Sequence, residues 1–471
     1  MFEPLADLER HARDRPTALA LATPSREFTF AQLHDMVLST SGQLHAGGVT
    51  AGALVAIDLS SALEWIVDLA LFRLGARTVS IRGVEQLGSL PVAALVTEPG
   101  VRGFLAPITV EVDEHWIDAA VRRQVEPPAI ADYPGAAYDF RLILTSGTTG
   151  SPRAAAYSVG AFTHRMSDGH LHWTDGRPEL TMIGLSTTGG FHAAAAALRL
   201  GVPYLAIDRI DADSLRFAAR HGIRVLCGSP VQVALALQVL AEAAIALPEL
   251  EEVRLSGATP SPALLGLVAQ LPGVIVRSVY GSTEGGGVTQ VFLDVHSDPY
   301  AVGAALPGVE LQVVDETGTP TTAEGLLRYR SPGLVSGYLI ADAVVPFPDG
   351  WFVPGDRATL APDGTLTLAG RNEEIFNLGG VKLDPVVVDR LALAFAGVDD
   401  AAAFRVERTP GIPEVGLAVV GPGCDLRALD QALRAALPVG HPTAYWRVDA
   451  IPRSRLGKPL RAQVAREFAA R

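Results

Sequence analysis

Apolar runs alternate with amphipathic stretches along the first 300 residues. The spacing predicts strands over residues 54–59, 93–96, 181–185, 225–227 and 274–279. It predicts helices over residues 30–44, 60–71, 191–200, 213–221 and 261–271, several of them preceded by a capping residue or followed by a glycine. Alternating strands and helices are typical of an α/β fold with a mainly parallel sheet.

The pattern changes further along the chain. Residues 309–368 have a more β-like spacing with turn signals at 315–318 and 362–364, which predicts a β-rich subdomain. The last hundred or so residues predict a compact α+β unit with strands near 402–406 and 416–420 and helices on either side. We therefore expect a large N-terminal domain, residues 1–371, with mixed or parallel sheets flanked by helices, and a small mobile C-terminal domain, residues 372–471.

Composition narrows the classes of function. The chain has 471 residues and 48% apolar content, so it can bury a large core. Its formal net charge of -13 opposes attachment to nucleic acid or to an anionic membrane and favours a small-molecule partner. Cys227 and Cys424 lie far apart and indicate neither a disulfide framework nor a zinc site. Because the N-terminus lacks an apolar signal core and the most apolar helix candidate is too short to span a bilayer, we expect a cytoplasmic protein.

One loop carries the clearest candidate chemistry. A strand that ends at residues 142–144 runs into six residues with two glycines and four hydroxyl side chains, followed by a proline and a cation. The candidate phosphate contacts are Thr145, Ser146, Gly147, Thr148, Thr149, Gly150 and Arg153. Glycines let backbone N–H groups approach an anion, and hydroxyls and a guanidinium donate to it, so the loop predicts polyphosphate binding. The spacing differs from that of the common P-loop, and as a bare pattern the loop fits an ordinary surface turn equally well.

The complete amino-acid sequence of this segment resembles the phosphate-binding loop of the adenylate-forming superfamily, which includes acyl- and aryl-CoA ligases, adenylation domains and luciferases. The resemblance extends over almost the whole chain, because five separated segments occur in the family's order. One departure is Arg153, where the family usually has lysine. The charge is kept, but a compact ammonium is replaced by a planar fork.

A second motif spans residues 280–284. By itself it fits a tyrosine-bearing turn with a solvated acid. The resemblance implies that Tyr280 stacks on adenine beside Gly281 and Ser282, that Thr283 touches the α-phosphate, and that Glu284 holds Mg²⁺, a metal that prefers oxygen ligands. Gly257 and Ala258 resemble the family's other adenine wall.

Three further positions follow from the resemblance. Asp356 would accept hydrogen bonds from the ribose hydroxyls, and Arg371 would contact the ribose or phosphate. Glu373 stands at the family's hinge position, where aspartate is common. Lys458 matches the catalytic lysine, which bridges the substrate carboxylate and the α-phosphate; as a bare pattern its segment fits a basic C-terminal turn.

The substrate pocket is expected beside residues 185–192. Its candidate lining residues are Thr187, Phe191, His192 and Ser229, together with Gly257 and Gly281. The usual gate histidine is missing at Thr187, and His192 is either its substitute or a helix residue with no ligand role. The absence of an aspartate near Thr187 favours a carboxylic acid without an α-amino group.

The resemblance therefore implies an ATP- and Mg²⁺-dependent enzyme that makes an acyl-adenylate and passes the acyl group to a thiol. We expect no attached carrier domain, so the thiol would come from coenzyme A or from the phosphopantetheine of a separate carrier protein. Two alternatives stay open: transfer to an amine or another nucleophile, and a nucleotide-binding regulator that has lost catalysis.

Overall fold

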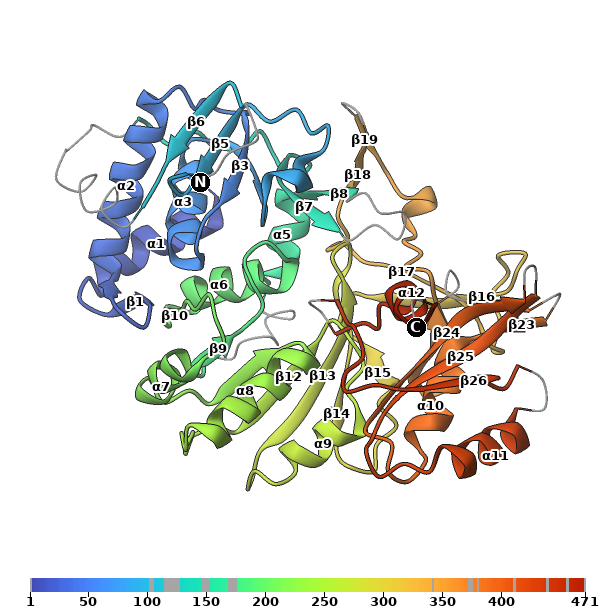
Figure 1. Ribbon diagram of the computed structural model, residues 1–471. Coiled ribbons are helices and arrows are strands. Elements are labelled where there is room, and N and C mark those ends of the chain that lie inside the picture. The colour runs from blue at the N-terminus through green and yellow to red at the C-terminus, as the bar shows by residue number, and fades with distance from the viewer. Residues whose placement is uncertain are drawn as a thin grey trace.

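The computed structural model describes residues 2–100, 106–113, 128–145, 153–167, 176–340, 343–371, 376–378, 381–409, 412–437, 440–454 and 457–469. Within these residues the chain forms two large sheets, three small ones and helices on their faces. In Figure 1 the N-terminal elements lie at the upper left, the middle of the chain at the lower left, and the C-terminal elements at the right.

The first large sheet has eight strands in the described part of the chain. Their order across the sheet is β19 (Ala343–Val345), β18 (Gly337–Ile340), β8 (Arg153–Ser158), β7 (Asp139–Thr145), β4 (Arg77–Ser80), β3 (Leu54–Asp58), β5 (Ala94–Thr97) and β6 (Ile108–Glu111). The strands from β7 to β6 are parallel, whereas β7, β8, β18 and β19 pair antiparallel. Strand β3 is almost wholly buried, which explains why it reads as a continuous apolar run.

The second large sheet has ten described strands. Their order is β16 (Glu310–Val314), β17 (Gly325–Arg330), β20 (Asp356–Leu360), β21 (Leu366–Arg371), β15 (Ala301–Ala305), β14 (Gly286–Leu293), β13 (Ile275–Ser282), β12 (Glu252–Ser256), β11 (Val225–Gly228) and β9 (Glu179–Thr181). The strands from β13 to β9 are parallel, and the other neighbouring pairs are antiparallel. The expected mixture of parallel and β-rich parts is therefore found within one sheet.

The small sheets complete the strand inventory. Strands β10 (Tyr204–Leu205), β1 (Leu19–Ala22) and β2 (Glu27–Thr29) form one sheet, and β22 (Phe376–Leu378) and β23 (Val381–Leu383) form another. Strands β24 (Asp400–Thr409), β25 (Ile412–Val420) and β26 (Ala444–Arg447) form the third.

Helices flank these sheets (Figure 1). The α-helices are α1 (Glu3–Asp14), α2 (Phe30–Ala46), α3 (Ser61–Arg73), α5 (Val159–Arg165), α6 (Thr188–Leu200), α7 (Ala212–Arg220), α8 (Pro230–Glu242), α9 (Pro262–Val268), α10 (Pro385–Leu393), α11 (Leu426–Ala436) and α12 (Arg461–Ala469). Short 3₁₀ turns occur at Val84–Leu87 and Pro348–Gly350. Local signals fix several ends: Thr29 and Gln32 form a capping box on α2, and Gly201 ends α6 with φ 66°.

The expected α/β architecture is confirmed, but some elements differ from the prediction. The strand expected over residues 181–185 ends at Thr181, and the helix expected over residues 261–271 ends at Val268. Strand β13 continues through Tyr280 to Ser282, so the second motif begins inside a strand and not in a loop. Helices α1, α5 and α8 and strand β8 were not predicted, because their apolar spacing alone does not separate them from neighbouring segments.

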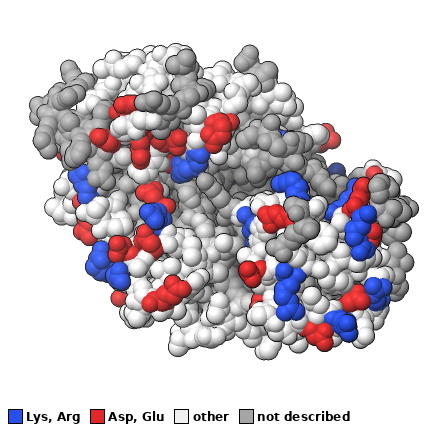
Figure 2. Space-filling view, viewed as in Figure 1, with Lys and Arg blue, Asp and Glu red and all other residues white. Residues whose placement is uncertain are grey.

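The buried apolar side chains gather into separate clusters. Among the described residues, four clusters are built from residues 2–368 and two from residues 376–468. The domain boundary at residue 372 stays a prediction. No described helix combines the length and the apolar character that crossing a bilayer requires. Figure 2 shows Lys and Arg interspersed with Asp and Glu on the face that it presents.

Candidate active site

The described ends of the phosphate loop lie on a hairpin. Strands β7 and β8 pair antiparallel, and their register places Thr145 opposite Arg153. The guanidinium carbon of Arg153 lies 5.5 Å from the centre of the Tyr338 ring. The residues between the two strands, Ser146, Gly147, Thr148, Thr149 and Gly150, lie outside the described residues, so their phosphate contacts stay predictions.

The second motif forms a tight turn between β13 and β14. The hydroxyl of Ser282 accepts hydrogen bonds from the backbone N–H groups of Glu284 and Gly285, both at 3.1 Å. The Ser282 Oγ also lies 2.8 Å from the Tyr329 hydroxyl. At Gly281 a Cβ would lie 2.0 Å from the carbonyl oxygen of Gly286, so glycine is required there by close backbone approach. Ser282 therefore shapes the turn that presents Glu284.

Glu284 is buried, with 6% exposure, and is held at both its side chain and its backbone. Its Oε1 accepts a hydrogen bond from the Tyr338 hydroxyl at 2.5 Å. Its carbonyl oxygen accepts from Arg165 Nη2 at 2.5 Å and from the Val335 N–H at 3.0 Å. The carbonyl of the preceding Thr283 accepts from the Thr188 hydroxyl at 3.1 Å. The backbone contacts fix the turn, and the Tyr338 hydroxyl holds one oxygen of the carboxylate.

The nucleotide-site candidates Tyr280, Asp356 and Arg371 lie in direct contact. The Tyr280 hydroxyl donates to Asp356 Oδ2 at 2.5 Å, and Arg371 Nε donates to Asp356 Oδ1 at 2.9 Å. Strands β20 and β21 place Asp356 opposite Arg371, which explains the ion pair. Burial, followed by the Asp356 charge, raises the pKa of the Tyr280 phenol well above its ordinary value, so it stays a hydrogen-bond donor.

The loop that carries Lys458 lies against the predicted adenine wall. A Cβ on Gly457 would lie 3.1 Å from Val231 Cγ2 and 3.6 Å from Ala258 Cβ. Gly257, which follows β12, has φ 89°, a conformation that glycine adopts without strain. Lys458 is exposed, and its backbone N–H donates to the Ser454 hydroxyl at 3.1 Å. The chain fold thus brings residues 257–258 and 457–458 side by side. Glu373, the hinge candidate, lies outside the described residues.

Two of the four substrate candidates cap helices. Thr187 caps α6: its hydroxyl accepts from the Gly190 N–H at 3.1 Å and donates to the Gly184 carbonyl at 2.9 Å. Ser229 is fully buried and forms a capping box with Gln232 at the start of α8. Both hydroxyls therefore have structural partners, and their contacts with substrate stay predictions.

The other two candidates are buried on α6. Phe191 has no exposed surface, belongs to the largest apolar cluster, and lies under the guanidinium of Arg141 at 4.4 Å. His192 Nε2 lies 2.5 Å from the Tyr157 hydroxyl. Burial, and then the charges of Arg165 and Arg141, lower the pKa of His192 well below its ordinary value, so the ring is neutral. His192 also borders a cavity next to the Glu284 turn, whose lining includes Arg165, Gly285, Gly287, Ser331 and Gly333.

The donor set fits a nucleotide with Mg²⁺. Among the described residues no group of three or more His, Cys, Asp or Glu could hold a metal ion. One carboxylate suffices for Mg²⁺, which keeps several waters and takes its remaining ligands from phosphate oxygens. Glu284 offers such a carboxylate, because Tyr338 occupies only one of its oxygens.

Tyr338 and Arg165 were not singled out by the sequence. Their contacts with Glu284 depend on the pairing of β18 with β8 and on the position of α5, neither of which the apolar pattern specifies. A glycine before a tyrosine in a β-like segment was the only local signal for Tyr338.

Residues 8–339 match the family model described as AMP-binding enzyme, and the chain belongs to this family. It is 26% identical to a medium/long-chain-fatty-acid acyl-carrier-protein ligase from Mycobacterium tuberculosis, over 96% of this chain and 93% of the relative. It is 28% identical to an indoleacetate–CoA ligase from Aromatoleum aromaticum, with 98% of each chain covered. A naringenin synthase from Pestalotiopsis fici is 27% identical over 97% of this chain, which spans only 18% of that longer protein.

Solved structures share the fold. The amide bond synthetase McbA from Marinactinospora thermotolerans matches with a TM-score of 0.83 and 23% identity, over 99% of each chain. Family membership and these relatives place the protein among AMP-forming acid–thiol ligases of the acyl-CoA synthetase type. Such an enzyme uses ATP to convert a carboxylic acid into an acyl-adenylate, and the acyl group then moves to its acceptor.

Proposed function

We propose that this protein adenylates a carboxylic acid without an α-amino group, and that it transfers the acyl group to the thiol of coenzyme A or of a separate carrier protein. The reaction centre would lie between the turn that carries Glu284 and the loop that carries Lys458. The observation that supports this proposal is the approach of Gly457 to Val231 and Ala258, because Gly457 precedes the candidate catalytic lysine and Ala258 belongs to the candidate adenine wall.

The nucleotide would be held from several elements. Tyr280 would lie against adenine opposite Gly257 and Ala258. Asp356 already accepts from Tyr280 and Arg371, but a carboxylate has about four acceptor positions, so it can still accept from the ribose hydroxyls. Mg²⁺ bound by Glu284 would supply charge neutralisation at the phosphates. Arg153 and the hydroxyls that follow β7 would donate to the phosphate oxygens.

In the first step a carboxylate oxygen of the acid attacks the α-phosphorus, and the bond from that phosphorus to the bridging oxygen of pyrophosphate breaks. Lys458 would stabilise the negative charge that gathers on the oxygens around the α-phosphorus. Thr283 would donate to the α-phosphate. Donors that are in place before the reaction stabilise the developing charge with little reorganisation.

In the second step a thiol loses its proton to water, its sulfur attacks the acyl carbonyl carbon, and AMP leaves with the electron pair of the broken bond. Residues 372–471 would swivel near Glu373 and present residues 379–382 to the site while Lys458 withdraws. Such closure, which assembles a different set of groups for each step, is a known class of mechanism. Transfer to an amine is the second candidate, because the fold is shared with an amide bond synthetase.

Pyrophosphate release tests the proposal. The protein is incubated with ATP, Mg²⁺ and hydroxylamine over a panel of aryl, short-, medium- and long-chain acids and amino acids. We expect a response to one class of acid lacking an α-amino group, after which coenzyme A, carrier proteins and amines are compared as acceptors. A response to amino acids alone, or none across the panel while ATP still binds, would contradict the proposal.

Replacing Lys458 with alanine separates binding from chemistry. Removal of one group that stabilises the charge of the transition state typically lowers the rate about 10²–10³-fold. We expect a loss of that size in acid-dependent pyrophosphate release, with ATP affinity measured by calorimetry changed by less than about threefold. Arg466→Ala, which removes an exposed cation from α12 in the same part of the chain, is the control. Full turnover in the Lys458 variant would refute its role.

A further inference from the structure

Tyr338 connects the two large sheets at the candidate active site. It lies on β18, next to β8, in the eight-stranded sheet, whereas Glu284 lies on the β13–β14 turn of the ten-stranded sheet. The Tyr338 hydroxyl donates to Glu284 Oε1 at 2.5 Å. The same ring lies 5.5 Å from the guanidinium carbon of Arg153. One side chain therefore contacts both a candidate metal ligand and a candidate phosphate ligand.

The position of Tyr338 is fixed by its surroundings. The Val335 N–H donates to the Glu284 carbonyl at 3.0 Å, and the Ser336 N–H donates to the Ala156 carbonyl at 2.8 Å. The register of β18 with β8 places Tyr338 opposite Ala155, and the Phe347 ring meets the Tyr338 ring edge-on at 5.5 Å. The segment is thus tied to the Glu284 turn on one side and to the strand that begins at Arg153 on the other.

We propose that Tyr338 is a positioning residue for ATP: its hydroxyl orients the Glu284 carboxylate, and its ring supports the Arg153 guanidinium. The inference rests on the proposed function, and it adds a role that the motif residues do not contain. Because the hydroxyl occupies Oε1, the other carboxylate oxygen would be the one that binds Mg²⁺. Partners of this kind orient metal ligands, and their loss typically weakens metal binding about 10–100-fold.

The ring adds a contact with Arg153 to that of the hydroxyl, which the Arg153 side chain also approaches. A planar guanidinium stacks on an aromatic face better than a compact ammonium does, so Tyr338 suits the arginine that stands where relatives usually have lysine. Arg153 is exposed and its side chain has many rotamers, and the ring limits them. The hydroxyl should therefore affect the contribution of Mg²⁺, and the ring should affect the phosphate contact even without metal.

Two variants of Tyr338 separate these effects. ATP affinity is measured by calorimetry with Mg²⁺ and, separately, with EDTA, in the absence of any acid. Tyr338→Phe keeps the ring but loses the hydroxyl that Arg153 also approaches, so we expect at most a small loss of affinity in EDTA and a loss of about 10–100-fold in the gain that Mg²⁺ provides. Tyr338→Leu removes the ring as well and should further weaken ATP binding in EDTA by a few fold.

Double variants test whether the contacts act through Tyr338. Glu284→Gln removes the carboxylate charge and should lower the Mg²⁺-dependent gain. Adding Tyr338→Phe to it should have little further effect, because the hydroxyl acts on the metal only through the Glu284 carboxylate. Arg153→Met should weaken binding in EDTA, and Tyr338→Leu should add little to it. The matched control is Tyr133→Phe, which removes a hydroxyl that donates to the Ala76 carbonyl at 2.8 Å and belongs to none of these motifs. It should leave both measurements unchanged.

The outcomes distinguish this inference from the proposed function. A Tyr338→Phe protein with wild-type Mg²⁺ dependence, or a double variant whose losses simply add, would overturn the inference even if the wild type adenylates an acid. If no acid is activated but the variants show the expected binding pattern, the inference holds and the proposed function fails. The thermal stability of Tyr338→Phe is compared with that of Tyr133→Phe. If both lose the same stability and only Tyr338→Phe loses Mg²⁺ dependence, Tyr338 positions the site and does not act merely through folding.

Discussion

The cations of this chain are almost all arginine. Of the 38 basic residues only two are lysine, Lys382 and Lys458. Arginine is therefore the ordinary cation of this protein, and Arg153 in the phosphate loop follows that preference. Its planar fork still carries the charge that a phosphate contact needs. The arginine at this position is therefore no sign by itself of a nucleotide-binding regulator that has lost catalysis.

Chemistry favours lysine over arginine at residue 458 for the proposed role. An ammonium is a compact charge on a flexible stem, and it can approach the substrate carboxylate and the α-phosphate in turn, whereas a guanidinium is broad and rigid. In a chain with so few lysines, Lys458 stands out without any comparison to relatives. This difference supports the proposed catalytic role of Lys458 and the proposed binding role of Arg153.

Substitution of Phe191 distinguishes a residue that lines the substrate pocket from one that belongs to the core. It is fully buried and lies within contact of the Trp65, Phe72, Phe140 and Phe162 rings. Truncation of a buried phenylalanine typically costs about 3–5 kcal/mol. We expect Phe191→Ala to lower the unfolding midpoint strongly and to leave the order of preference among accepted acids unchanged at low temperature. A changed order with little loss of stability would instead support a lining role.

At the scale of elements, helix α3 contributes two buried acids to a charged cluster. Glu64 and Asp68 are both fully buried. Glu64 pairs with Arg82 at 2.9 Å, and Asp68 pairs with Arg141 at 2.8 Å. Arg141 Nη2 also donates to the Leu185 carbonyl at 2.9 Å, so the cluster fixes the segment that leads into α6. Burial raises the pKa of Glu64 to about 7 despite these arginines.

The raised pKa of Glu64 predicts how the free energy of unfolding depends on pH. In the unfolded chain its pKa is near 4.5, so between pH 4.5 and 7 only the folded protein keeps the proton. The contribution of Glu64 to the free energy of unfolding is complete below pH 4.5. It falls by about 3 kcal/mol as the pH rises to 7. We expect the difference in unfolding midpoint between wild type and Glu64→Gln to change across this range in favour of the variant. A constant difference from pH 5 to 8 would contradict the raised pKa.

A surface carboxylate, Glu251, serves as the control for the prediction about Glu64. Glu251 pairs with Arg224 and Arg177 on the surface of the ten-stranded sheet, and its pKa is lowered by the hydrogen bonds from these arginines. Glu251→Gln should therefore show no change of its difference from wild type between pH 5 and 8. Comparing Glu64→Gln with Glu251→Gln tests burial as the cause of the raised pKa of Glu64.

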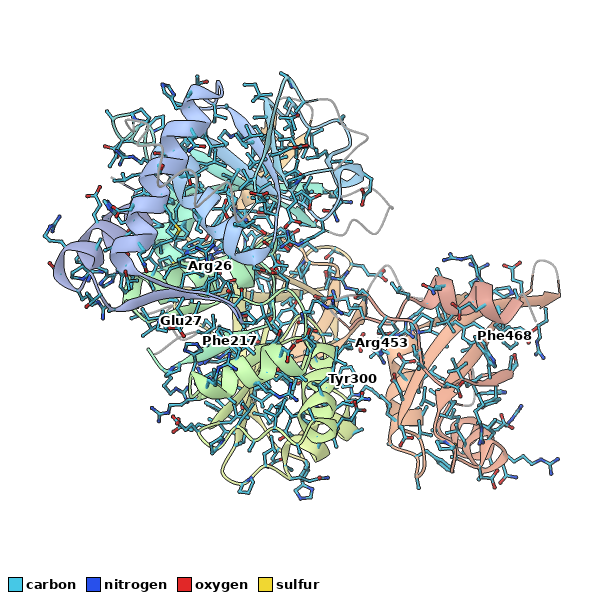
Figure 3. All side chains as sticks on the ribbon, turned by 60° about the vertical axis from the view of Figure 1, so that its left-hand side comes forward. Arg26, Glu27, Phe217, Tyr300, Arg453 and Phe468 are labelled. Carbon is cyan, nitrogen blue, oxygen red and sulfur yellow. The ribbon has the colours of Figure 1, made fainter. Side chains whose placement is uncertain are left out.

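At the scale of the whole molecule, the C-terminal elements contact the ten-stranded sheet through an exposed patch. Arg390 on α10 pairs with Asp298 at 3.0 Å and lies 4.4 Å from the centre of the Tyr300 ring. Figure 3 shows Tyr300 on the side that faces the C-terminal elements, with Arg453 at their near edge. These contacts would favour the arrangement in which Lys458 lies beside the nucleotide site.

Removing this contact should affect one step of the reaction more than the other. An exposed ion pair and a cation–π contact each contribute about 0.5–1 kcal/mol, so Arg390→Ala, which removes both, should reduce the rate of adenylation by about five- to thirtyfold. Transfer from preformed acyl-adenylate to the thiol should not slow. Single-turnover measurements of the two steps check this, with Arg434→Ala, which removes a pair with Asp430 within α11, as the control. Equal losses in both steps would contradict the expectation.

Local chemistry explains how much of the fold could be predicted. Thr29, Gly201 and Asp384 act within one turn of their own helices, and the structure finds each of them at a helix end. The order of the motifs also follows from the sequence alone. Apolar spacing failed where a segment is apolar on all sides, as at α8, and where a strand runs on into a motif, as at Tyr280.

The sequence by itself determined the alternation of strands and helices, the helix caps and the positions of residues such as Glu284 and Lys458 along the chain. Only the tertiary structure decided which of them meet. The hydrogen bond from Tyr338 to Glu284 exists because β18 joins the eight-stranded sheet beside β8 while the Glu284 turn belongs to the other sheet. Caps and turns depend on neighbours along the chain, whereas the order of strands in a sheet depends on the packing of residues far apart in sequence, which no local pattern encodes.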